Sequence, residues 1–252
     1  MASSSEVKKH EVVAIIDRSG SMFGKENDTI GGINSAIEVL KTEPEPNTDV
    51  KVSIKLFDHE EFMLIRSIDL QHVRPLETRQ FKPRGQTALL DAIGNTLKYF
   101  IEKKITNSNA YHVCTVYIVT DGLENCSKHY NLDTIKEMIS NAEENYSIKI
   151  LYLAANQDAI LEANKFGIAA DQAMNYNENT ENVDSAFRGA ASAARRHVSG
   201  HGVSFTHAER MASQPAEQSL SIPLPPPVNV DRSRSNNISP PPRMRRQKSR
   251  IS

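Results

Sequence analysis

Three separate stretches of this 252-residue sequence place oxygen-bearing side chains where they can bind a metal ion. Asp17, Ser19 and Ser21 follow an apolar run at alternate positions, Thr87 lies in a polar loop, and Asp121 follows the run VCTVYIVT. The five residues offer two carboxylates and three hydroxyls, without a histidine or a thiolate. Such hard oxygen donors suit Mg²⁺ or Mn²⁺ better than zinc or copper. A set with only two carboxylates also leaves a coordination position for water or for an acceptor from another molecule.

Alternating strand-like and helix-like segments predict the elements that position these side chains. Buried strands are expected where apolar residues run almost without interruption, at residues 12–16, 113–120 and 148–154. Amphipathic helices are expected at residues 28–41, 88–104, 132–144, 158–166 and 181–197. This alternation predicts an α/β fold, with a doubly wound, mostly parallel sheet and helices on both faces.

Two further strands complete the predicted sheet. Residues 50–58 alternate with period two, and residues 62–70 resume a strand pattern only four residues later. Because so short a connection permits only a hairpin, one strand is expected at an antiparallel edge of the sheet. Ligands of such sheets bind beyond the carboxyl ends of the strands, and all three oxygen-bearing stretches fall there. Gly20 lets the first of these loops turn tightly, so that one cation collects the side chains on either side of it.

Each stretch also has a simpler explanation when it is taken alone. Asp, Ser and Gly are ordinary turn residues, so Asp17, Ser19 and Ser21 fit a turn or a helix cap. Thr87 fits the N-cap of the helix that follows it, and Asp121 with the glycine after it is a common turn dipeptide. The metal-site interpretation depends on all three stretches occurring together, each on a loop at the predicted carboxyl edge.

The sequence DRSGS, the threonine of GQTALLDA and the sequence TDG together resemble the Asp-x-Ser-x-Ser, Thr, Asp pattern of von Willebrand factor type A domains. In that family these residues form the metal-ion-dependent adhesion site. The resemblance covers about residues 10–196, and RGQTALLDAIG, VTDGLENCSKHY and LAANQDAI are similar to small stand-alone domains from microbes, phages and large viruses. It implies a Rossmann-like fold in which Ser19, Ser21 and Thr87 touch the metal, while Asp17 and Asp121 hold it directly or through water.

Three functions from different classes are compatible with these residues. We favour a non-catalytic binding module, in which an Asp or Glu of a protein partner completes the coordination of the metal and no small-molecule substrate is involved. The second is a Mg²⁺-dependent phosphoryl-transfer hydrolase with Asp17 as nucleophile. Against it, Ser19 stands where the haloacid-dehalogenase pattern has a second aspartate, and the sequence has neither a Walker loop nor a GxSxG elbow. The third is a scaffold whose tail makes the functional contact.

Composition divides the chain into three parts. Residues 1–9 are expected to be a flexible N-terminus, residues 10–199 the folded domain, and residues 200–252 a disordered, proline-rich basic tail. From His201 onwards the chain has eight Lys and Arg against three Asp and Glu, whereas the whole chain has a net charge of −1. The segment RMRRQKSR fits a nuclear address, a nucleic-acid or membrane contact, or phosphorylation at Ser249. A solvated tail without a dedicated role fits it equally well.

The remaining sequence features bear on the location of the protein. The first residues, MASSSEVKKHE, lack the apolar segment of a signal peptide, and no stretch reaches the ~18 apolar residues of a membrane span. Cys114 and Cys126 fit neither a disulfide framework nor a zinc pattern. We therefore expect an intracellular protein, located in the cytoplasm or, if the basic tail acts as an import signal, in the nucleus.

Two other polar groups are interpreted as ordinary surface. Residues 58–61, Asp-His-Glu-Glu, lie at the predicted hairpin tip and are expected to form an exposed charged turn. His197 and His201 are four residues apart, a spacing that can pair two metal ligands on a helix. The glycines at positions 200 and 202 instead favour a solvated helix end.

Overall fold

The computed structural model describes residues 6–155 and 158–214. Its strands form one sheet in the order β3-β2-β1-β4-β5-β6. The strands are β1 (Lys8–Asp17), β2 (Thr48–Phe57), β3 (Glu61–Asp69), β4 (Val113–Thr120), β5 (Ile148–Ala155) and β6 (Ala173–Tyr176). Neighbouring strands run parallel except β2 and β3, which form the antiparallel pair at one edge. The predicted α/β fold with a mostly parallel sheet and one antiparallel edge strand is confirmed.

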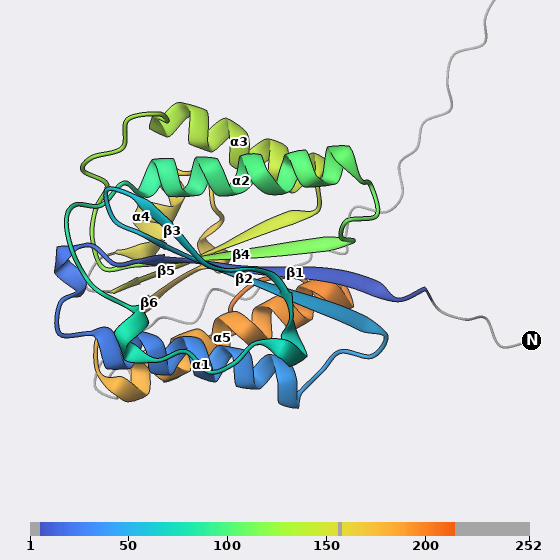
Figure 1. Cartoon of the computed structure of the whole chain (residues 1–252), viewed down its shortest axis with the longest axis horizontal. Coiled ribbons are helices and arrows are strands. Elements are labelled where there is room, and N and C mark those ends of the chain that lie inside the picture. Colours follow the sequence, from blue (N-terminus) through green and yellow to red (C-terminus); the bar gives the residue numbers. More distant parts are fainter. Residues whose placement is uncertain (1–5, 156–157, 215–252) are drawn as a thin grey trace, which may run out of the picture. The chain divides into compact units, whose positions relative to one another are not determined.

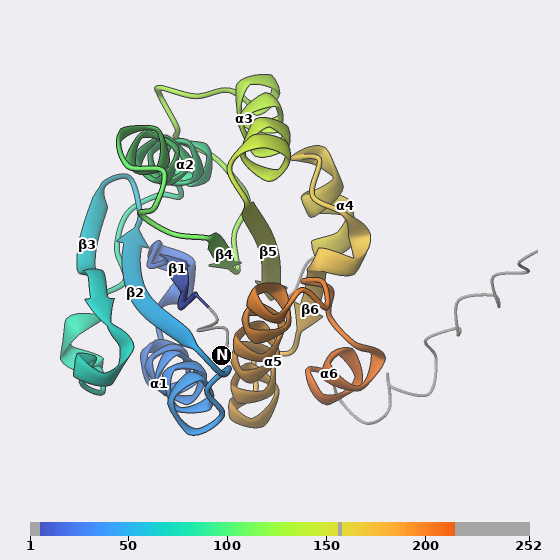
Figure 2. The ribbon, with the colours of Figure 1, turned by 90° about the vertical axis from the view of Figure 1, so that its right-hand side faces the viewer.

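Helices cover both faces of this sheet, as Figure 1 shows from the side and Figure 2 shows along the strands. On one face lie α2 (Leu89–Thr106) and α3 (Leu132–Asn145). On the other face lie α1 (Glu26–Thr42) and α5 (Thr180–Ser199), which pack against each other. The short helix α4 (Ala159–Lys165) lies beside β5 and β6. Within the described residues, no helix has the length and apolar character that a membrane crossing needs.

The central strand β1 explains why both faces need helices. Val12 and Ile16 join the apolar core beneath α1 and α5, whereas Val13 and Ile15 join the core beneath α2 and α3. Every residue from His10 to Asp17 is buried. A strand that is buried on both faces appears in the sequence as a continuous apolar run, which is why this strand is predictable.

The structure differs from the prediction at both ends of the domain. β1 begins at Lys8, two residues inside the predicted flexible N-terminus, and β6 is absent from the prediction because four residues show no clear period. The chain also stays ordered beyond Gly200. Val203 and Phe205 are buried, and α6 (His207–Ala212) begins with the capping box of Thr206 and Glu209.

The predicted disorder from residue 200 is therefore wrong for residues 201–214, where two buried apolar side chains and a helix cap outweigh the polar composition. The rest of the predicted tail, including RMRRQKSR and Ser249, lies outside the described residues, as do residues 1–5. By its internal contacts the chain divides into residues 1–220 and residues 221–252, and all of the second unit lies outside the described part.

Candidate metal centre

The predicted stretches meet at the carboxyl edge of the sheet. β1 ends at Asp17 and β4 ends directly before Asp121, and these two strands are hydrogen-bonded neighbours. The Ser19 N–H donates to Asp17 Oδ1 at 2.7 Å, and Ser19 Oγ lies 2.9 Å from Ser21 Oγ. Ser21 Oγ in turn donates to Asp121 Oδ1 at 2.6 Å. Four of the five predicted residues thus form one continuous hydrogen-bonded chain.

Thr87 reaches the same place from the loop before α2. A Cβ atom built onto Gly122 would lie 3.3 Å from Thr87 Oγ1, 3.5 Å from Ser21 Oγ and 3.7 Å from Asp17 Oδ2. Oxygen atoms from three loops therefore converge on one point beside Gly122, which a larger residue would fill. The structure brings all five predicted residues together.

Asp17 is held rigidly at the floor of this centre. The carboxylate is fully buried, and the Thr120 hydroxyl donates to its Oδ2 at 2.7 Å, opposite the bond from Ser19. Burial raises the pKa of Asp17 to about 6, although the hydrogen bonds from Thr120 and Ser19 work in the other direction. A nearby divalent cation would stabilise the charged form of such a carboxylate.

The hydroxyl of Thr87 remains available to a ligand. Thr87 is only 3% exposed, and its Oγ1 atom forms no hydrogen bond with any of the described residues. It is not the N-cap, because α2 is capped by Ala88 without a side-chain bond. Because this hydroxyl oxygen forms no bond within the described residues, its lone pairs can coordinate a cation. The donor set therefore fits an oxygen-coordinated divalent metal.

Hydrogen bonds of Asn125 and Asp91 join the loop after β4 to the start of α2. Neither residue is predicted from the sequence to have this role. Asn125 Oδ1 accepts a hydrogen bond from the Thr87 N–H at 2.9 Å, and the Asn125 N–H donates to the Thr87 carbonyl at 3.1 Å. The Asp91 carboxylate accepts bonds from three successive backbone N–H groups, at 2.8, 2.9 and 3.0 Å, in residues 128–130. Both side chains lie in the stretches RGQTALLDAIG and VTDGLENCSKHY, but their types alone do not distinguish them from surface polar residues.

Lys25 also lies at the metal centre, although its position in the sequence does not predict this. Its ammonium group contacts the carboxylates of Asp121 and of Glu178, and Glu178 lies between β6 and α5. The Asp121 side chain is only 2% exposed, so Lys25 neutralises an almost buried charge. Burial alone would lower the pKa of Lys25, but hydrogen bonds and charges from Asp121 and Glu178 raise it overall.

The hairpin tip is exposed and charged at residues 59–61, as the sequence predicts, but its first residue, Asp58, is not exposed. Asp58 is fully buried, with Oδ2 lying 2.9 Å from Arg18 Nε and 3.0 Å from Arg84 Nε. His59 and Glu60 are exposed, and their ligand atoms lie within 4.8 Å of that carboxylate. Arg18 and Arg84 already neutralise the Asp58 carboxylate. This carboxylate therefore links the loop after β1, the loop after β2 and the loop before α2, and it does not offer a metal site.

His197 is half-buried and hydrogen-bonded, and is not a solvated helix end. α5 continues to Ser199, which places His197 within the helix. Thr115 Oγ1 lies 2.8 Å from His197 Nδ1 and 2.9 Å from His10 Nε2, so one hydroxyl links the two rings. His201 is exposed and follows the helix. Only the tertiary structure brings His10 next to His197.

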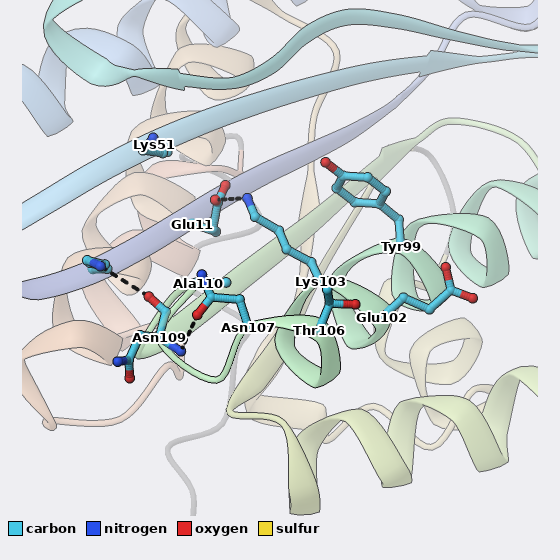
Figure 3. A pocket seen from close by; sticks show the side chains of 10 residues that line it. Glu11, Lys51, Tyr99, Glu102, Lys103, Thr106, Asn107, Asn109 and Ala110 are labelled. Atoms are coloured by element: carbon cyan, nitrogen blue, oxygen red, sulfur yellow. Dashed lines mark hydrogen bonds and ion pairs between the residues drawn. The ribbon is translucent and has the colours of Figure 1, made fainter.

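A cavity of about 590 Å³ lies at the opposite, amino edge of the sheet, between the start of β1 and the end of α2. Figure 3 shows Lys103 reaching from α2 to contact Glu11 of β1. Lys51 Nζ lies 3.6 Å from Asp69 Oδ1. Lys9, the third lysine of the lining, donates from Nζ to the Asn109 carbonyl at 3.2 Å. The lysines of this cavity therefore have partners within the chain, and the five predicted residues lie elsewhere.

Comparisons with known proteins give fold relatives only. No protein-family model and no curated protein matches the sequence. Proximal thread matrix protein 1 from the mussel byssus, solved with a zinc-occupied MIDAS motif, matches with a TM-score of 0.53 and 12% identity, over 75% of this chain and 46% of that one. The pilus adhesin SpaC from Lactobacillus rhamnosus GG matches with a TM-score of 0.55 and 10% identity, over 77% of this chain and 31% of that one.

A third match concerns a domain of similar size. The vWF domain of the type V pili tip protein Mfa5 from Porphyromonas gingivalis matches with a TM-score of 0.51 and 12% identity, over 75% of this chain and 95% of that one. By contrast, this chain spans less than half the length of the mussel protein and of SpaC. Identities this low establish the fold alone. The chain is therefore a domain with the von Willebrand factor type A fold.

Proposed function

We propose that this domain is a non-catalytic protein-binding module that depends on a divalent metal. Asp17, Ser19, Ser21, Thr87 and Asp121 would hold one Mg²⁺ or Mn²⁺ ion, and an Asp or Glu of a protein partner would complete its coordination. The observation that carries the proposal is the convergence of these oxygen atoms beside Gly122. Two fold relatives support it by analogy, one solved with a zinc-occupied MIDAS motif and one described as a pilus adhesin.

The exposure of the five residues indicates the direction from which a partner would approach. Asp17, Ser19 and Thr87 are buried, whereas Ser21 and Gly20 are exposed. A cation in this centre would thus be covered by protein on one side and open on the side of Ser21. A partner carboxylate would bind there strongly, because Coulomb attraction in a partly dry site exceeds that in water.

The surroundings of Asp17 also favour binding over catalysis. A nucleophilic aspartate needs a free carboxylate oxygen that can reach the substrate. Here Oδ1 accepts the Ser19 N–H, Oδ2 accepts the Thr120 hydroxyl, and the carboxylate is fully buried. These contacts suit a group that orients metal ligands and give no support to attack on a phosphate ester.

Calorimetric titration of Mg²⁺ and Mn²⁺ into the full-length protein tests the metal site. We expect saturable binding of one ion, weakened about tenfold or more in Ser21→Ala and Thr87→Val, since a lost contact to a charged group costs about 1.5–3 kcal/mol. Ser108→Ala and Thr106→Val are matched controls, because both residues are exposed and lie at the end of α2 away from the centre. Absence of binding in the wild type, or equal binding in variants and controls, would refute the proposal.

A further inference from the structure

A small pocket beside the metal centre has an apolar lining and plays no part in holding the cation. Its volume is about 240 Å³, and its walls include Leu90 from the start of α2, Leu123 from the loop after β4, Leu132 from α3 and Phe166 after α4. Leu123 is 57% exposed and Leu132 is also exposed. The surface around the centre therefore presents large apolar side chains to solvent.

Two residues of the pocket wall lie close along the chain to residues of the metal centre. Leu89, in the pocket wall, follows Thr87 by two residues, and Leu123 follows Asp121 by two residues. Two residues of extended chain span at most ~7 Å. The pocket wall therefore begins within that distance of two of the five residues that would hold the cation.

The exposed Leu123 lies on a firmly held loop. Its neighbour Glu124 accepts hydrogen bonds from the backbone N–H groups of Leu90 at 2.9 Å, Cys126 at 2.8 Å and Ser127 at 2.7 Å. The loop is thus joined to the start of α2 at the pocket itself. A partner that covers Leu123 would not have to order this loop, which lowers the entropic cost of binding.

The charged groups of the lining already have partners. The Glu124 carboxylate is occupied by those backbone bonds and by the Ser127 hydroxyl at 2.7 Å. Glu162 Oε1 accepts from Lys165 Nζ at 2.6 Å. Because the described lining offers no free charge, the pocket suits an apolar side chain rather than a charged one.

We propose that this pocket binds a large apolar side chain of the same partner segment whose Asp or Glu completes the metal centre, an inference that rests on the proposed function. In an extended segment, alternate side chains point the same way and residues rise ~3.3 Å each. A residue two positions from the acidic one lies ~6.6 Å away, which is comparable with the two-residue separation of Thr87 from Leu89 and of Asp121 from Leu123. The recognised motif is an acidic residue and a Leu, Ile, Phe or Met separated by one residue, in either order.

Selection from a random heptapeptide phage library tests this motif. The full-length protein is immobilised with Mg²⁺, and bound phage are eluted with EDTA. We expect the eluted peptides to be enriched both in Asp or Glu and in a large apolar residue two positions away. With Leu123→Ser, the acidic residue should remain enriched and the apolar residue should lose its enrichment. Ile105→Ser is the matched control, since Ile105 is 66% exposed near the end of α2, away from the pocket.

The outcomes separate this inference from the function on which it rests. Acidic peptides without an apolar residue at that spacing, or an unchanged selection with Leu123→Ser, would overturn the pocket assignment and leave the metal-dependent module standing. Absence of any EDTA-eluted acidic peptides would overturn both. Thermal melting of Leu123→Ser beside Ile105→Ser verifies folding, and Leu132→Ser provides a second variant of the same wall with the same expected result.

Discussion

The ammonium group of Lys25 contacts the carboxylate of Asp121, so a positive charge of the chain itself lies at the proposed metal centre. The same ammonium group also contacts the carboxylate of Glu178. A divalent cation and this ammonium group cannot both pair closely with Asp121, because like charges a few ångströms apart repel by several kcal/mol in a partly buried site. Metal binding should therefore move Lys25 towards Glu178.

The variant Lys25→Met should bind Mg²⁺ more tightly, because the cation no longer competes with a resident charge. We expect the dissociation constant to fall about tenfold, which corresponds to about 1.4 kcal/mol. The metal-free variant should also melt at a lower temperature, since the buried Asp121 carboxylate loses its neutralising partner. Calorimetry and thermal melting measure the two effects. Lys128→Met is the control, as Lys128 is exposed, and weaker Mg²⁺ binding by Lys25→Met would show that Lys25 assists the metal.

Stability should fall as the pH drops below about 6.5, because the buried His10 and the half-buried His197 resist protonation. Burial lowers the pKa of His10 to about 3 and that of His197 to about 4, with smaller contributions from the charges of His197 and Lys149 respectively. Their pKa in the unfolded chain is about 6.5, so between these values the unfolded state binds more protons. For His10 the loss in unfolding free energy between pH 7 and pH 5 is about 2 kcal/mol.

Urea denaturation at pH 7, 6 and 5 measures this dependence as the difference between wild type and His10→Gln. Asp17 has the opposite effect: because its pKa is raised to about 6 in the fold, its contribution to stability increases as the pH drops. This contribution is the same in wild type and His10→Gln, so it cancels when the two are subtracted. His72→Gln is the control, since the His72 side chain is 78% exposed. An equal pH dependence in wild type and His10→Gln would show that His10 is protonated without unfolding.

Asp91→Ala should destabilise the domain by about 2–3 kcal/mol. The carboxylate accepts three backbone N–H bonds from the loop after β4, and its removal leaves these donors without their partner. Urea denaturation measures the change, with the exposed Asp133→Ala as control. Because the same loop positions Asp121, Mg²⁺ binding should weaken as well. A change below about 0.5 kcal/mol would mean that water replaces the carboxylate at little cost.

A protein ending at residue 214 should be more stable than one ending at residue 199. The shorter chain lacks Val203 and Phe205, both buried against the domain, and α6, whose Glu209 accepts two bonds from Arg196 at 2.8 and 2.9 Å. Loss of two buried apolar side chains costs about 3 kcal/mol or more. Comparison of the two chains by urea denaturation tests this expectation. Equal stability would place the domain boundary near Gly200 after all.

Much of the fold and of the candidate centre is predictable because it depends on local patterns. Continuous apolar runs define β1 and β4, and the change to Asp17 and Asp121 marks where each strand ends. The bounds of β4, Val113–Thr120, agree with the prediction. Parallel strands bring such ends to one edge of the sheet, so the five candidate residues can be proposed from their types and from the predicted loops on which they lie.

Only the tertiary structure decides which distant groups meet at that edge. Lys25 meets Asp121 across 96 positions of sequence, and Arg84 meets Asp58 across 26. These pairs depend on strand order and on the paths of loops, which no periodicity encodes. For the same reason, the burial of Asp58 and the pocket beside Leu123 appear only once the loops are packed. Local sequence thus determines where β1 and β4 end, and long-range packing determines the charges and surfaces that surround the centre.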